Sequence, residues 1–512
     1  MQMIGRSRFF LFAAGLGLAQ APQAVLWNDV TKEALGTTAA WTNKVEIADL
    51  NGDGRPDLLF ANGGNYSEPG APEVNGAFLH TGQGFKFEDR SGAIFGKAPG
   101  LARVIKARDV NGDGLTDILV GNTYQTQSRL YLGTGKGAFD DVTPTHLPRS
   151  LNSIGDLEWG DVDGDGDLDA VLADWGAGNN MTNDGGRMLL WVNDGRGRFS
   201  DGAGRMPTGL IRFSWDIELA DTDNDYDLDL LVSCKRCANS TLYRNDGHGT
   251  FAEDPRAMPQ YTNNYEFEPM DLDGDGFLDL VTINDGDIVG GNGSSRREHV
   301  FRNDGKGRFR DVTDRWWPDA HNVGEDDNMV AFLDVDSDGD ADFVVGSLSG
   351  PDRLLRNDGK GNLTVDLKVF DGEPTPGTLG LALADLDGDG RMDVIQAQGE
   401  HPKATDERIF AGRGLAPDTA PPSITLVSAT DGALRVVRAR VHDRKSPSLA
   451  TEWKKVVVEW TTAQGAREVP MQWYGEYLWR AAWPSDVPAS AAYRVCATDA
   501  AGNSSCSPPP TK

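Results

Sequence analysis

The sequence is poor in basic residues: 49 Lys and Arg stand against 78 Asp and Glu, for a net charge of −29. Binding of nucleic acid needs a basic stripe or patch, and the sequence has none, so that class is excluded. Enzyme signatures are also lacking, because the seven His are scattered and no GxSxG, HExxH or glycine-rich phosphate loop occurs. We therefore expect a binding protein rather than an enzyme. Paired carboxylates for glycoside cleavage keep a carbohydrate-active enzyme as the alternative.

Long apolar runs are missing after the N-terminus, so we expect no membrane span there. The N-terminus itself resembles a signal peptide: two arginines precede the short apolar run 9–18, and small residues follow up to Ala21. Cleavage after Ala19 is favoured over cleavage after Ala21, because a proline follows Ala21. We assign residues 1–21 to the signal peptide and expect a secreted protein, either extracellular, at the cell surface or periplasmic. An uncleaved N-terminal anchor is the alternative.

Cysteine is scarce: the four are Cys234, Cys237, Cys496 and Cys506. An exported protein oxidises its cysteines, and four cysteines allow three pairings. Closeness in sequence favours Cys234–Cys237 and Cys496–Cys506. The C-x-x-C spacing of the first pair also fits a redox motif or half of a zinc site, but no second such pair and no His pair accompanies it.

What the sequence has in abundance is one nine-residue phrase, D-x-[DN]-x-D-x-x-x-D. Its starts recur about 50 to 63 residues apart along one continuous stretch. The seven copies are DLNGDGRPD, DVNGDGLTD, DVDGDGDLD, DTDNDYDLD, DLDGDGFLD, DVDSDGDAD and DLDGDGRMD, which start at Asp49, Asp109, Asp161, Asp221, Asp271, Asp334 and Asp385.

A second phrase follows each copy and is clearest as NDGRGRF at Asn193, NDGHGTF at Asn245 and NDGKGRF at Asn303. Asn-Asp-Gly followed by another Gly is tight-turn chemistry. Short apolar runs flank both phrases, so each unit is interpreted as strand, acidic loop, strand, variable loop, strand, glycine turn and strand. Seven units of four strands predict an all-β fold, a seven-bladed β-propeller.

The two ends of the repeat region complement each other. Several units continue after the glycine turn with F-x-D-V-T, as in 139–143 and 309–313, but the last unit, which ends at Leu415, lacks this strand. Residues 27–31, Trp-Asn-Asp-Val-Thr, have the same pattern. We predict that they complete the last blade and remove an open sheet edge. An open solenoid is the alternative.

The repeats resemble FG-GAP/VCBS repeats, the units of the integrin alpha-subunit propeller and of many exported bacterial proteins. The resemblance covers residues 25–416, and the acidic loop is its most specific part. It implies a propeller with rigid calcium loops between the first and second strands of each blade.

The acidic phrase also resembles the first nine positions of an EF-hand loop, in which oxygens at positions 1, 3, 5, 7 and 9 surround one ion. Such a set suits calcium rather than magnesium, which prefers octahedral geometry and retained water. None of the seven copies has Glu at position 12, so a helix–loop–helix switch is not expected. Asx-turns without metal are the alternative. We expect about seven calcium ions.

The expected oxygen donors, with backbone carbonyls at Arg55, Leu115, Phe277 and Arg391, follow loop by loop. They are Asp49, Asn51, Asp53, Arg55 and Asp57; Asp109, Asn111, Asp113, Leu115 and Asp117; Asp161, Asp163, Asp165, Asp167 and Asp169; Asp221, Asp223, Asp225, Asp227 and Asp229; Asp271, Asp273, Asp275, Phe277 and Asp279; Asp334, Asp336, Asp338, Asp340 and Asp342; and Asp385, Asp387, Asp389, Arg391 and Asp393.

The fourth loop departs from the pattern. Tyr226 stands where Gly takes the sharp turn, and Asn224 replaces another Gly. A tyrosine at positive φ is strained, so we expect this site to be the weakest.

Charged residues recur three and five positions before five of the seven loops, on the strand that the family resemblance places innermost, and the blades of Ala331 and Ala382 lack them. The charged residues are Lys44, Glu46, Lys106, Asp156, Glu158, Asp216, Glu218, Glu266 and Glu268. We expect them to gather near the central axis, either as a solvated polar channel or as a site for a cation or basic ligand.

The composition of the sequence changes after the last repeat. Acidic loops stop, prolines mark a linker, and about seven short strand-like runs predict a small β-sandwich. The phrase from Tyr493 to Asn503 resembles the last strand of immunoglobulin-like or fibronectin type III-like modules. The predicted domains are the signal peptide 1–21, the propeller 25–416, the linker 417–423 and the sandwich 424–510.

The longest insertions of the repeats, 62–75, 174–186 and 284–298, follow the second strand of a blade, so they lie on the face opposite the acidic loops. They carry Tyr66, Trp175, Asn179 and Asn180, and one connection between blades adds Trp316, Trp317 and His321. Exposed aromatics beside amides suit a sugar ring or a protein hot spot. We expect a glycan or an extracellular protein as ligand, and a monomer. A structural subunit of a surface assembly, and packing of Trp316 and Trp317 between blades, are the alternatives.

Overall fold

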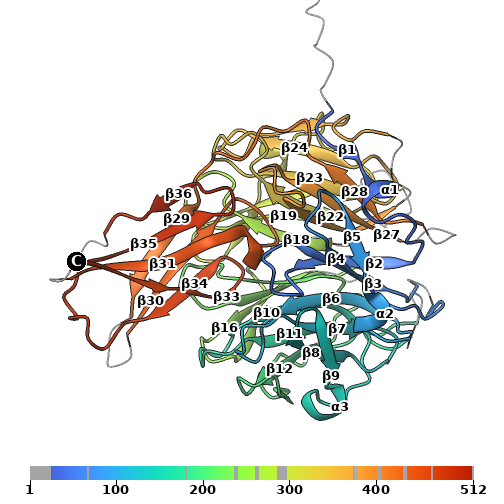
Figure 1. The fold of residues 1–512 in the computed structure, drawn as a ribbon, viewed down its shortest axis with the longest axis horizontal. Coiled ribbons are helices and arrows are strands. Elements are labelled where there is room, and N and C mark those ends of the chain that lie inside the picture. Colours follow the sequence, from blue (N-terminus) through green and yellow to red (C-terminus); the bar gives the residue numbers. More distant parts are fainter. Residues whose placement is uncertain are drawn as a thin grey trace, which may run out of the picture.

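The structure is a computed structural model that describes residues 25–509 except 66–67, 98, 179–181, 236–239, 260–263, 285–296, 373–374, 376, 400–404, 431–434 and 463–464. The predicted signal peptide, 1–21, and Cys237 therefore lie outside the described residues. The described chain is all-β and forms nine four-stranded sheets. Seven of them come from residues 28–411 and form a β-propeller, and the other two form a β-sandwich (Figure 1).

Each blade is an antiparallel meander of four strands that follow one another from the axis outward. The blades are β2(Thr42–Ala48), β3(Asp57–Asn62), β4(Gly76–His80) and β5(Phe87–Asp89); β6(Ala102–Arg108), β7(Asp117–Asn122), β8(Arg129–Gly135) and β9(Ala138–Asp141); β10(Ile154–Gly160), β11(Asp169–Asp174), β12(Met188–Asn193) and β13(Phe199–Asp201); β14(Ile217–Ala220), β15(Asp229–Val232), β16(Thr241–Asn245) and β17(Phe251–Asp254); β18(Asn264–Met270), β19(Asp279–Asn284), β20(His299–Asn303) and β21(Phe309–Asp311); β22(Asp327–Leu333), β23(Asp342–Ser347), β24(Arg353–Asn357) and β25(Leu363–Asp366); and β26(Thr378–Ala384), β27(Asp393–Gln398), β28(Arg408–Ala411) and β1(Asn28–Asp29).

The second strand of each blade is buried on both faces, because each blade is covered by a neighbour on either side. Every residue of β7 is buried, for example, which explains the short continuous apolar runs after the acidic loops. Four-residue helical turns follow the outer strands: α1(Thr31–Ala34), α2(Ser91–Ile94), α3(Thr143–His146) and α4(Thr313–Trp316). None of the helices in the described part of the chain has the length and apolarity to cross a membrane.

The predicted closure of the ring is confirmed. β1 pairs with β28, with Asn28 opposite Ala411 and Asp29 opposite Phe410. The adjacent Trp27 is buried, stacks on Phe370 at 5.1 Å and donates its indole hydrogen to the carbonyl of Met392 at 2.9 Å. The last blade is thereby a composite of both ends of the propeller segment, and β26 packs against β2 of the first blade.

The C-terminal unit is the predicted β-sandwich. One sheet has the order β29(Ser423–Ala429), β30(Val436–His442), β34(Leu478–Ala482) and β33(Gln472–Gly475); the other has β32(Gly465–Pro470), β31(Trp453–Thr462), β35(Tyr493–Asp499) and β36(Ser504–Cys506), and a short 3-10 turn, η1(Ala450–Glu452), precedes β31. The disulfide Cys496–Cys506 joins β35 to β36, as predicted, and Cys234 is also disulfide-bonded. Figure 1 shows the sandwich, in orange and red, beside one face of the ring.

Candidate metal loops and axial chamber

Each acidic loop joins the innermost strand to the second strand, and its first aspartate organises the turn. In the first loop, Asp49 accepts the backbone N–H groups of Gly52 at 2.8 Å and Gly54 at 2.7 Å. Gly54 has φ of +79°, a conformation that a side chain rarely adopts. The D-x-x-x-x-G spacing therefore folds the loop locally, with the first carboxylate at its centre.

The ninth aspartate ties the loop to the third strand of the blade. Asp57 accepts the backbone N–H of Leu50 at 2.8 Å and that of His80 at 2.7 Å. Asp117, Asp279, Asp342 and Asp393 bind the corresponding N–H groups in their own blades. The sequence predicted the ninth position only as a metal ligand, but it also holds the blade together.

Carboxylate oxygens converge in these loops. Within each of the following sets, one ligand oxygen per residue lies within 4.8 Å of the others: Asp161, Asp163 and Asp169; Asp221, Asp223 and Asp225; Asp271, Asp273 and Asp279; Asp334, Asp336 and Asp342; and Asp385, Asp387 and Asp393. Among them, Oδ1 of Asp163, Oδ2 of Asp169 and Oδ1 of Asp273 are buried without a hydrogen-bond partner. Buried, unpartnered hard oxygens at this spacing fit a calcium ion.

The pKa values of the aspartates at position 9 of the acidic loops also fit a bound cation. Burial, with help from the neighbouring loop carboxylates, raises the pKa of Asp57 and Asp117 to about 7 and that of Asp169, Asp279 and Asp342 to about 8. Without a cation these carboxyls would take up protons near neutral pH. A divalent ion beside them favours the ionised form.

Arginines of the third strand reach into three of the loops, which the sequence pattern alone did not show. Arg244 lies 2.9 Å from a carboxylate oxygen of Asp223, Arg302 lies 2.6 Å from one of Asp273, and Arg356 lies 3.0 Å from one of Asp336. In each case the partner is the third residue of the loop. These guanidinium groups compensate part of the negative charge in the fourth, fifth and sixth blades.

The glycine turns connect neighbouring blades. The amide of Asn193 donates to the carbonyl of Val110, in the acidic loop of the preceding blade, at 2.7 Å. Asn245, Asn303 and Asn357 make the same bond to Val162, Thr222 and Leu272. The NDG phrase thus shapes a turn, as predicted, and also fixes each blade to the loop before it.

The unusual fourth loop is a docking point for the sandwich. Tyr226 has φ of +73° and Asn224 has φ of +64°, so both adopt the conformation that Gly takes elsewhere. The hydroxyl of Tyr226 donates to the carbonyl of Leu426, and Arg438 lies over its ring at 4.3 Å. Asn224 accepts a hydrogen bond of 2.8 Å from Arg440. The departure from glycine is explained by these contacts.

Other sandwich residues contact the same face of the propeller. Arg440 also donates to the backbone carbonyl of Asp221 at 2.9 Å, Arg480 forms an ion pair with Asp161, and Arg444 donates to the carbonyl of Gly339. The sandwich therefore covers acidic loops of the third, fourth and sixth blades.

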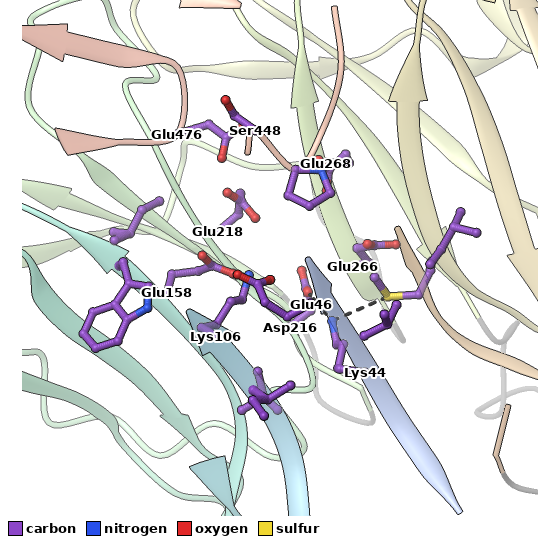
Figure 2. A pocket seen from close by; sticks show the side chains of 18 of the residues that line it. Lys44, Glu46, Lys106, Glu158, Asp216, Glu218, Glu266, Glu268, Ser448 and Glu476 are labelled. Carbon is purple, nitrogen blue, oxygen red and sulfur yellow. Dashed lines mark hydrogen bonds and ion pairs between the residues drawn. The ribbon is translucent and has the colours of Figure 1, made fainter. Parts of the chain in front are cut away.

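The innermost strands surround a chamber of about 70 Å³ on the axis, which the sandwich closes with residues 447–448, 473 and 476 (Figure 2). Of the nine charged residues predicted near the axis, eight line it, and the ninth, Asp156, lies 4.0 Å from Lys44. Three ion pairs span the chamber wall: Lys44–Asp216 at 3.5 Å, Lys106–Glu158 at 2.5 Å and Arg108–Glu46 at 3.1 Å.

Three of the four predicted ligand aromatics do not form an exposed platform. Trp175, Trp316 and Trp317 are only 1%, 2% and 0% exposed. Trp175 packs edge-on against Trp215 at 4.4 Å, and Trp317 packs edge-on against Phe343 at 5.5 Å. The expected exposure of these three side chains was wrong, because bulky side chains are needed to fill the wedges between and behind blades.

The other predicted ligand residues have different outcomes. His321 is half-buried, and its carbonyl accepts the indole hydrogen of Trp317 at 2.9 Å. Tyr66, Asn179 and Asn180 lie outside the described residues.

Comparison with known proteins gives a family for the repeats. The family model described as "FG-GAP-like repeat" matches residues 109–172 and 334–395, so the chain contains FG-GAP-like repeats within a β-propeller. No curated protein sequence matches the chain. Among solved structures, BBS1N in complex with ARL6DN is 11% identical over 75% of this chain and 96% of its own, with a TM-score of 0.45. The Dos1 propeller is 10% identical over 77% of this chain and 96% of its own, with a TM-score of 0.44.

Proposed function

We propose that the protein is an exported, calcium-binding β-propeller that binds a glycan or an extracellular protein and does not catalyse a reaction. The observation that carries the proposal is the convergence of buried, unpartnered carboxylate oxygens in the repeated acidic loops. Calcium in these loops would make the ring a rigid scaffold, and an immunoglobulin-like or fibronectin type III-like sandwich is attached to it. Variable loops on a rigid scaffold are the usual place for binding.

The binding face is the one opposite the acidic loops. The sandwich covers part of the acidic-loop face through Arg440, Arg444 and Arg480. The opposite face has the longest connections within the blades, between β3 and β4, β11 and β12, and β19 and β20. Trp175, the first residue of the second of these connections, is buried and packs against Trp215.

The test blocks one face at a time. Asp184 is exposed in the β11–β12 connection, and His248 is exposed in the glycine turn between β16 and β17, on the acidic-loop face. Asp184→Cys and His248→Cys, each coupled to a polyethylene glycol maleimide, are probed on a printed glycan array and on a panel of extracellular matrix proteins. We expect signals of the unmodified protein to fall at least tenfold for modified Asp184→Cys and to stay within twofold for modified His248→Cys. The reverse pattern, or no signal from any form, contradicts the proposed function.

A further inference from the structure

The axial chamber has far more acid than base. Its negative residues are Glu46, Asp156, Glu158, Asp216, Glu218, Glu266, Glu268 and Glu476, and its positive residues are Lys44, Lys106 and Arg108. The three ion pairs of the chamber wall use all three bases. A surplus of buried carboxylates has to be compensated by bound cations or by protons, because an isolated buried charge is very costly.

The surplus is concentrated at the end of the chamber next to the sandwich. Figure 2 shows Glu218, Glu268 and Glu476 there, on the side away from Lys44. In the described part of the chain, none of the three has a basic group within 4.0 Å. Glu268 is 8% exposed and is hydrogen-bonded to the neutral hydroxyl of Ser446.

One carboxylate oxygen at the sandwich end of the chamber is buried and unpartnered, and a second lies in the residue next to Lys44. Oε1 of Glu476 accepts no hydrogen bond, and neither does Oδ1 of Asp156, a residue that is 1% exposed. The remaining space, about 70 Å³, is lined by Glu218, Glu268 and Glu476. A cavity needs roughly 10–15 Å³ of such space to hold one water molecule, so this one has room for an ion together with water.

The position of Glu476 is imposed by its neighbours. The carbonyl of Tyr474 accepts the backbone N–H of Asp161 at 2.8 Å, and the hydroxyl of Tyr477 donates to the carbonyl of Pro269 at 3.1 Å. These two anchors, on either side of Glu476, hold the β33–β34 turn over the chamber. The sandwich therefore adds a carboxylate to a site that is already acidic, which opposes docking unless a cation or a proton neutralises it.

We propose that the chamber binds one divalent cation, with calcium as the preferred ion, through Glu218 and Glu268 of the propeller and Glu476 of the sandwich. Carboxylate oxygens from three strands or turns suit a hard cation with flexible geometry. The ion is separate from the loop ions of the proposed function, and it links the two domains by neutralising the charge that keeps them apart.

Ion counting tests this proposal. Wild type, Glu476→Gln and Glu218→Gln are dialysed against buffered calcium and their bound calcium is measured by mass spectrometry. Glu468→Gln is the control, because Glu468 lies on the same sandwich but pairs with Lys455 at 2.7 Å outside the chamber. We expect both chamber variants to bind one ion fewer than wild type, and the control to bind the same number. Equal counts in all four proteins overturn the proposal.

Thermal unfolding is a second test, in which Glu476→Gln should shift the melting temperature in opposite directions in calcium and in chelator. In calcium, Glu476→Gln should lower the melting temperature, because a ligand is lost. In chelator it should raise the melting temperature, because one of several like charges is removed. A rise in both conditions means that protons neutralise the chamber, and the proposal is wrong.

The loop variant Asp165→Ala separates this proposal from the proposed function. It should lose one ion while leaving the ion that depends on Glu476 in place. If wild type binds only the ion that depends on Glu476, the proposal for the loops fails and the proposal for the chamber stands.

Discussion

Tyr474 of the sandwich donates its hydroxyl hydrogen to the backbone carbonyl of Tyr226 in the fourth acidic loop, over 3.1 Å. The same tyrosine accepts, through its carbonyl, the backbone N–H of Asp161 in the third loop. One residue thus connects the sandwich to two adjacent blades. The loops that bind the sandwich are loops predicted to bind metal, so metal content and domain docking are expected to depend on each other.

Removal of Arg440 should release the sandwich. Arg440 is buried and donates to Asp221, Asn224 and Gly276, and Arg440→Met leaves these acceptors unpaired at a cost of about 1–3 kcal/mol each. We expect faster proteolysis of the connection 412–422 between β28 and β29, and a larger radius of gyration by X-ray scattering. Arg494→Met, which breaks an exposed pair with Glu459, is the control and should match wild type. Compact Arg440→Met protein would contradict the docking role.

Removal of metal should lower stability. A site held at 100 times its dissociation constant adds about 2.7 kcal/mol, so chelation of about seven sites should lower the melting temperature strongly. Asp165→Ala should lose one ion and part of that stabilisation. Asp140→Ala, on the exposed outer strand β9, should lose neither. Metal analysis that finds two or fewer ions in wild type would reject the calcium loops.

The composite blade depends on Trp27. Its side chain is buried against Phe370 and bonded to Met392, and loss of a buried Trp side chain costs about 3–5 kcal/mol. Trp27→Ala should therefore lower the melting temperature and expose a strand edge that promotes aggregation. Val25→Ala changes a side chain that is 41% exposed and should leave both properties unchanged. Light scattering measures aggregation, and calorimetry measures the melting temperature. If both are unchanged in Trp27→Ala, ring closure contributes little to stability.

Trp175 should behave as a packing residue. Trp175→Ala is expected to lower the free energy of unfolding by about 3–5 kcal/mol, because it leaves a cavity beside Trp215 and Phe213. Leu210→Ala, at a side chain that is 57% exposed, is the control. Denaturant titration measures both. A fully stable Trp175→Ala protein that has lost ligand binding would restore the original prediction of a binding role.

Stability should fall between about pH 4.5 and pH 8 because of Glu407. This carboxyl is buried between the last and first blades, accepts hydrogen bonds from Thr42 and from the backbone of Gln398, and burial raises its pKa to about 8. A raised pKa means that the folded protein binds this proton more tightly than the unfolded chain does. The resulting contribution to the free energy of unfolding is fully present below pH ~4.5 and is lost as the pH rises through 8. Glu407→Gln should flatten this slope in excess calcium, and exposed Glu88→Gln should not. An identical slope in Glu407→Gln would exclude Glu407 as its source.

Local signals in the sequence predicted most of the architecture. The acidic loops and NDG turns are short motifs whose hydrogen bonds lie within a few residues, as at Asp49, so their spacing defines the strands. The missing strand of the last unit was found because residues 27–31 repeat a pattern seen in other units. The charged face of the innermost strands was found because strand residues alternate between two faces.

What the sequence could not predict depends on contacts between distant residues. Arg244 reaches Asp223 from the third strand, and Tyr226 is held by a domain about 200 residues further along. Trp316 was misassigned for the same reason: its neighbour is Gly361, in the glycine turn of the next blade. An aromatic residue in a connection looks the same in sequence whether it faces solvent or a neighbouring blade.

The pairing of β1 with β28 also sets the order of events when the chain is made. Thr31 exchanges hydrogen bonds with Ile409, 378 residues later, so the first strand of the propeller has to wait for the synthesis of β28. Until then the chain is an incomplete ring with unpaired strands at both ends, and such intermediates are prone to self-association. Closure is therefore a late step with a large loop-closure cost, after which the seven blades are expected to unfold as one cooperative unit.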